Sequence, residues 1–154
     1  MSSPASLPDE IFKAAVRGEL QKVVKWLRKG GAVDALGSTT ARGGRSTTDT
    51  LLLAATAHGH LALVKELLKR GASVDLPNSL GFTALMHAAV YGHPSGHPSI
   101  LLVLLQHSAN PDLQDIDGGT ALMSAVDQGQ EACVTCGPPL KISRRRATRP
   151  KAST

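Results

Sequence analysis

Residues 83–112 read TALMHAAVYGHPSGHPSILLVLLQHSANPD, and the spacing within this segment decides the fold. The segment opens as T-x-L-x-x-A-A-x-x-G-H, continues into an apolar run that ends in a pair of leucines, and closes on Ala109 and Asp112. Apolar residues at helical spacing on both sides of a glycine predict two short helices joined by a tight turn. The same order of residues recurs, with changes, before and after this segment.

The distance along the chain between successive inter-helix glycines gives the length of each repeat. Gly18, Gly59, Gly92 and Gly129 are separated by 41, 33 and 37 residues. The first excess over 33 lies in residues 35–49, ALGSTTARGGRSTTD, whose composition predicts an enlarged, flexible loop that is solvated rather than packed. The second excess is the tandem duplication GHPSGHPS at residues 92–99, which is expected to lengthen the connection between two helices at little cost.

These intervals divide the chain into units. We expect a flexible start at residues 1–5, a repeat domain at 6–134 and a disordered basic tail at 135–154, with repeats at about 6–34, 50–75 and 83–112 and a partial repeat at 120–134. The partial repeat should leave the apolar side of the Ile100–Leu105 helix poorly covered. Ser108 stands where the second repeat has Gly71, so a left-handed helix end there should cost on the order of 1 kcal/mol.

The recurring T-x-L-x-x-A-A-x-x-G-H pattern, the paired leucine and the closing Ala and Asp resemble an ankyrin repeat over roughly residues 6–134. The resemblance implies an all-α fold, an α-solenoid of stacked helix-turn-helix pairs joined by hairpin loops. Two features depart from the family pattern. Ala84 and Ala121 replace its usual proline, and Leu53, Met86 and Met123 replace its usual histidine, so the family's Thr to His hydrogen bond is not expected.

The resemblance also implies a function. Ankyrin repeats generally bind protein partners and carry no catalytic apparatus or cofactor, so we expect a scaffold or interaction module. Partners of such repeats usually lie along the hairpin tips and inner helices, and the matching positions here are Ala57, His58, Ser79, Leu80, Phe82, Val90, Tyr91, Ile116, Asp117, Asp127 and Gln128. Tyr91 is favoured as a binding anchor, whereas Phe82 is equally compatible with a role in the core.

The net charge of +5 belongs to the tail, because the six basic residues of positions 137–154 are accompanied by no acid. They are Lys141, Arg144, Arg145, Arg146, Arg149 and Lys151. As an alternative function, this tail could bind nucleic acid, an anionic membrane surface or a nuclear import receptor. A third interpretation is that the chain is a truncated or alternatively joined fragment of a longer array.

Several other classes of protein are not expected. The longest apolar run, Ile100–Leu105, is far shorter than the roughly 20 residues of a membrane span, and the acidic amino-terminal segment does not resemble a signal peptide. A location in the cytoplasm or the nucleus follows from this. Cys133 and Cys136 supply only half of a zinc site, and the histidines after the repeat glycines match the repeat pattern, so no metal site is expected. No nucleophile, base and orienting acid occur at motif spacing, so no enzyme is expected.

Overall fold

The structure is a computed structural model that describes residues 6–40, 44–90 and 98–127. Its helices follow one another in antiparallel pairs: α1 (Asp9–Arg17) with α2 (Leu20–Arg28), α3 (Leu51–Ala57) with α4 (Leu61–Lys69), and α5 (Ala84–Val90) with α6 (Pro98–Gln106). Helix α7 (Ala121–Asp127) begins the fourth unit. Two strands, β1 (Leu36–Thr40) and β2 (Ser46–Thr50), lie between the first two pairs.

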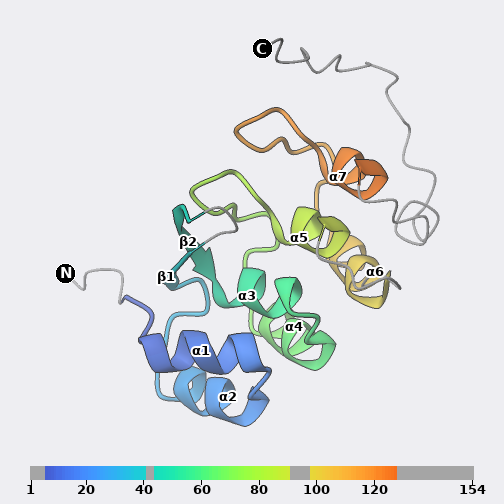
Figure 1. Cartoon of the computed structure of the whole chain (residues 1–154). Helices are drawn as coiled ribbons and strands as arrows, with labels where there is room; N and C mark the ends of the chain where they lie inside the picture. Colours follow the sequence, from blue (N-terminus) through green and yellow to red (C-terminus); the bar gives the residue numbers. More distant parts are fainter. Residues whose placement is uncertain (1–5, 41–43, 91–97, 128–154) are drawn as a thin grey trace.

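The helix pairs pack one on the next. Helices α1, α3, α5 and α7 form one row in which each contacts its neighbour, while α4 packs against α6 in a second row (Figure 1). The small residues of the motif allow this close approach, since Ala55 and Thr56 in α3 and Ala88 in α5 are fully buried. Larger apolar residues such as Leu51 and Leu104 fill the space between the rows.

The glycine between the helices makes the same tight turn in the first two pairs. Gly18 and Gly59 have φ angles of 75° and 76°, which disfavour any residue with a Cβ atom. The backbone amide of the residue after each glycine donates to a carbonyl five residues back, Glu19 to Ala14 at 2.8 Å and His60 to Ala55 at 2.9 Å. The repeated glycine therefore has a structural role in these two turns.

The threonine that opens each later repeat caps an inner helix. Thr50 Oγ1 accepts a hydrogen bond from the amide of Leu53 at 3.2 Å, and Thr83 and Thr120 accept from the amides three residues later at 3.4 Å. A hydroxyl at this place satisfies a backbone donor that the first turn of a helix leaves free. In these repeats, which lack the family's histidine, the threonine hydroxyl is therefore hydrogen-bonded to a backbone amide.

The predicted flexible loop between the first two repeats is wrong, and a small two-stranded sheet is added to the otherwise helical fold. Instead of a flexible, solvated loop, β1 and β2 form an antiparallel ribbon with Leu36 opposite Thr50 and Thr40 opposite Ser46. The threonines are β-branched and favour extended backbone. One face of the ribbon also packs on the first repeat, because a Cβ atom at Gly37 would lie 2.6 Å from the Phe12 ring.

Aspartates at the ends of repeats tie neighbouring units together. The Asp34 carboxylate accepts from the amide and the hydroxyl of Ser73, at 2.9 and 2.6 Å, and the Asp75 carboxylate accepts from the amide of Asn110 at 2.9 Å. Ser73 and Asn110 occupy equivalent places in the second and third repeats. The closing Asp of the repeat pattern therefore bonds to the next repeat rather than within its own.

The prediction that the Ile100–Leu105 segment is poorly covered is wrong for three of its six residues. Ile100, Leu101 and Leu104 are buried, because α6 packs against both α4 and α5, and only Leu102 is an exposed large apolar residue of this helix. The helix also begins earlier than the duplication suggests, with Pro98 as its first residue. A proline is tolerated there because the backbone amide at the start of a helix has no partner within the helix. Within the described ranges, no helix combines the length and apolar character needed to cross a membrane.

The ends of the outer helices support the prediction made for Ser108. Its φ angle is 63°, and Gly71, at the equivalent position of the second repeat, has a φ of 87°. In both repeats the next amide donates to a carbonyl five residues back, Ala72 to Leu67 and Ala109 to Leu104, each at 3.0 Å. Ser108 is the only non-glycine residue with positive φ among the described residues.

We predict that Ser108→Gly raises the free energy of unfolding by up to about 1 kcal/mol, because it relieves the left-handed strain of an exposed residue. Urea unfolding of the purified chain measures this change. The matched control is Gly71→Ser, which should lower stability by a similar amount, since a Cβ atom there meets nothing within 4 Å and only the backbone angle opposes it. Equal stability of Ser108→Gly and the parent chain would contradict the prediction.

Candidate functional site

A hollow in the described part of the chain lies where the ribbon meets the inner helices. Its volume is about 390 Å³. We call it the corner pocket, and its lining residues are Thr39, Thr40, Thr47, Asp49, Ala57, His58, Asn78, Leu80, Phe82 and His87. They come from β1, β2, the end of α3, the loop before α5, and α5 itself. The size is within the range of pockets that bind ligands or side chains.

The loop before α5 is held by one side chain. Asn78 is buried, and its Oδ1 accepts hydrogen bonds from the amides of Leu80 and Phe82 at 2.9 and 3.0 Å. Asp115 does the same in the fourth unit, where its Oδ1 accepts from the amides of Asp117 and Gly119. Each loop is therefore a finger with a fixed turn, and we name them the third and fourth fingers, residues 76–82 and 113–119.

The fingers also bond to one another. Asn78 Nδ2 donates to Asp49 Oδ1 at 2.9 Å, and the Thr48 amide donates to Ser79 Oγ at 3.4 Å, which joins the third finger to the ribbon. The Ile116 amide donates to the Leu80 carbonyl at 3.1 Å, which joins the third finger to the fourth. Gly81 combines a φ of 77° with an approach so close that a Cβ atom would lie 2.9 Å from the Asp115 Cα. The ribbon and the two fingers are thus laterally connected by hydrogen bonds.

The structure brings together four of the predicted partner-binding residues. Ala57, His58, Leu80 and Phe82 all line the corner pocket. Phe82 is half-buried against the core, and its ring lies 5.7 Å from that of His87 in the pocket lining, so the side chain contacts both the core and the hollow.

The remaining predicted residues lie elsewhere. Ser79, Ile116 and Asp117 are exposed on the fingers, beside the pocket but not in its lining. Val90 is the half-buried last residue of α5, and Asp127 is the last residue of α7. Tyr91, Gln128, the cysteines and the whole basic tail lie outside the described residues.

Six lining residues were not predicted: Thr39, Thr40, Thr47, Asp49, Asn78 and His87. The four on the ribbon were missed because residues 35–49 were taken for a solvated loop. Alternating threonines are a strand signal that could have indicated otherwise. Asp49 could also have been found by alignment, since it directly precedes Thr50 as Phe82 precedes Thr83.

His87 is the strongest electrostatic feature of the pocket. Burial lowers the pKa of His87 from 6.5 to about 4, the Asp49 carboxylate opposes this shift, and the nearby His58 adds to it. The imidazole is therefore neutral at pH 7. Two other histidines have structural contacts: His58 Nδ1 donates to the Ala54 carbonyl at 3.0 Å, and His60 Nε2 donates to the Val16 carbonyl of the first repeat at 2.8 Å.

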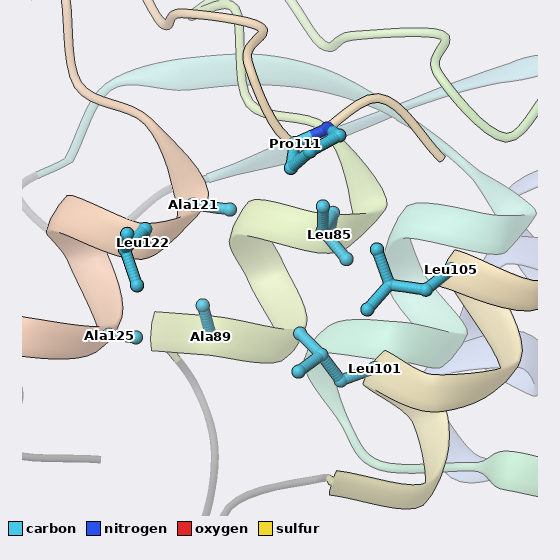
Figure 2. Close-up of a pocket in the computed structure, with 8 residues that line it drawn as sticks. All are labelled: Leu85, Ala89, Leu101, Leu105, Pro111, Ala121, Leu122 and Ala125. Carbon is cyan, nitrogen blue, oxygen red and sulfur yellow. The ribbon is translucent and has the colours of Figure 1, made fainter. Parts of the chain in front are cut away.

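A second hollow is much smaller, and its lining is apolar. Figure 2 shows it between α5, α6 and α7, where Leu85, Ala89, Leu101, Leu105 and Leu122 are among the apolar side chains around it. Its volume is about 20 Å³, roughly the space of one water molecule. It is a packing gap at the edge of the fourth unit. In residues 6–40, 44–90 and 98–127, no three His, Cys, Asp or Glu side chains are grouped to hold a metal ion.

Comparison with known families agrees with the repeat geometry. The family described as ankyrin repeats, in three copies, matches residues 11–115. This range extends from α1 to the fourth finger and contains the whole corner pocket. No curated protein sequence matches the chain significantly.

The buried imidazole predicts a loss of stability in acid. Since the pKa of His87 is about 4 in the folded chain and near 6.5 when unfolded, the unfolded state binds the proton first as pH falls. Stability contributed by neutral His87 is thus complete above about pH 6.5 and is lost progressively towards pH 4, by up to about 3 kcal/mol. Urea unfolding at pH values from about 7 to about 4 measures the loss.

The matched variant is His87→Ala, because Ala54 occupies the equivalent position of the second repeat. It should flatten the pH dependence of the unfolding free energy in this range, whatever its effect on stability at neutral pH. Replacement of the exposed His107, which directly follows α6, by Ala should leave the slope as it is. An unchanged slope in His87→Ala would show that another group causes the acid sensitivity.

Proposed function

Because the chain belongs to the ankyrin repeat family, whose members generally act as protein-interaction modules without catalytic activity, we propose that it binds a protein partner at the corner pocket and the adjacent finger tips. The stacked helix pairs would form a short solenoid that supports this surface. The partner would lie across the ribbon and the third and fourth fingers. No cofactor and no catalytic group is assigned to the chain.

One observation supports this choice of surface above the others. Four residues that match the family's usual contact positions converge on a single hollow of about 390 Å³, although they come from two different repeats. A hollow of mixed polar and apolar lining suits a side chain of a partner, with the apolar contribution coming from Ala57, Leu80 and Phe82. The small apolar gap beside α7 offers no comparable volume.

The connected fingers provide a second reason. Binding is weakened when loops must be ordered at the same time, and a surface that is already ordered avoids this cost. Here Asn78 holds the third finger, Asp115 holds the fourth, and Asp49 and Leu80 join these fingers to their neighbours. The surface therefore has a defined shape before a partner arrives.

The apolar tip of this surface supplies a direct test. Leu80 is half-exposed and Ile116 is 61% exposed, and the two residues are joined through the backbone of neighbouring fingers. We predict that Leu80→Ala with Ile116→Ala weakens partner binding roughly tenfold or more, since both side chains would be covered on binding. The folded state should remain, because neither side chain is buried.

The measurement uses peptides selected on the full chain from a displayed library of random sequences, with affinities determined by isothermal titration. Leu102→Ala is the control, because Leu102 is a 44% exposed leucine on α6, away from the fingers. Selected peptides should bind this control as well as they bind the parent chain. Peptides that bind the Leu80 and Ile116 double variant unchanged would place the binding surface elsewhere.

A further inference from the structure

The corner pocket has a chemistry more specific than a general protein contact. We propose that it receives the side chain of an arginine residue in an extended segment of the partner, an inference that rests on the proposed function. Among the ten lining residues, Asp49 is the single acid, and none is lysine or arginine. The described residues that line the pocket therefore contribute one negative charge and no cation.

The Asp49 carboxylate can accept further hydrogen bonds. Its Oδ1 accepts from Asn78 Nδ2 at 2.9 Å, and no other described residue donates a hydrogen bond to this side chain. An ionised carboxylate can accept about four hydrogen bonds. The bond from Asn78 fixes the orientation of the group, and the half-buried position of Asp49 strengthens its attraction for a cation.

The nearby groups do not neutralise this charge. Burial keeps the pKa of His87 at about 4, so its imidazole carries no charge at pH 7. Arg45 immediately precedes β2 and lies at the opposite end of the ribbon, four residues from Asp49, which is about 13 Å along an extended chain. The ion pairs among the described residues involve Lys13, Arg17, Lys22 and Arg70, none of which pairs with Asp49.

The surrounding side chains favour a guanidinium over a compact ammonium. Thr39 and Thr47 face each other across the ribbon, and Asp49 follows Thr47 at the two-residue spacing that places side chains on the same face. Their hydroxyls, together with the carboxylate, offer acceptors to the five N–H donors of arginine. The Phe82 ring, which also lines the pocket, can stack on the flat guanidinium, an arrangement that favours arginine over lysine.

The equivalent position in the third repeat explains why the pocket is acidic only on the ribbon side. Phe82 precedes the capping Thr83 as Asp49 precedes the capping Thr50, so the two residues occupy matching places in adjacent repeats. An acid and an aromatic ring thus line the same hollow from neighbouring units, so the lining contains both a charge and a flat apolar surface.

The experiment starts from peptides selected on the full chain whose binding depends on Leu80 and Ile116. We expect an arginine common to these peptides, and its replacement by citrulline, which has the same shape but no charge, should weaken binding roughly tenfold or more. Replacement by lysine should also weaken binding. Asp49→Asn, which can still accept from Asn78, should cause the same loss for the arginine peptide but little further loss for the citrulline peptide.

Asp112→Asn is the matched control, because it removes one negative charge from an exposed residue outside the pocket, and it should leave binding unchanged. The citrulline peptides test the inference on the unaltered protein, whatever the stability of Asp49→Asn. Finger-dependent peptides that tolerate citrulline, or that bind equally well with lysine, would overturn the arginine pocket while the proposed function remains. Failure to obtain any finger-dependent peptide would overturn both.

Discussion

Every helix pair in this protein has an apolar face that only its neighbours can cover. The helices are short, between 7 and 9 residues, and such helices are not stable in water by themselves. Their stability comes from rows in which α3 lies between α1 and α5, and α5 lies between α3 and α7 (Figure 1). Small residues such as Ala55 and Ala88 make the rows close enough to exclude water. The other features of the structure depend on this stacking.

Stacking alone does not align the repeats, and the polar residues of the motif do so. Asp34 and Asp75 each bond to the following repeat, and His60 reaches back to the Val16 carbonyl of the preceding one. The two aspartate bonds recur at matching positions, and each joins one repeat to the next. As a result, the fingers lie side by side, and the bonds between Asn78 and Asp49 and between Ile116 and Leu80 become possible.

Much of the repeat geometry could be predicted because the relevant interactions are local. The left-handed backbone angles at Gly18 and Ser108 are examples. Each is set by residues within a few positions in the chain. The resemblance to ankyrin repeats is confirmed by the family match over residues 11–115. The ribbon was not predicted, because a segment rich in Gly, Ser and Thr is compatible with both a solvated loop and a paired strand.

The candidate site could be predicted only in part for the same reason. The positions of Ala57, His58, Leu80 and Phe82 follow from the repeat register, which is a property of the sequence. Asp49 becomes part of the site only when β2 pairs with β1 and Asn78 bonds to it from the next repeat. The pKa of His87 falls to about 4 because the side chain is buried between neighbouring units, so the imidazole stays neutral until the pH approaches this value.

The sequence by itself therefore determined the repeat family, the helix pairs and the capping residues, since these depend on short-range spacing and backbone preferences. The tertiary structure decided that Leu36–Thr40 pairs with Ser46–Thr50 and that Ile100, Leu101 and Leu104 are buried. It also decided which side chains meet in the corner pocket. The contacts that join neighbouring repeats, such as Thr48 with Ser79 and His60 with Val16, link residues 31 and 44 positions apart, so they form only when the repeats are stacked.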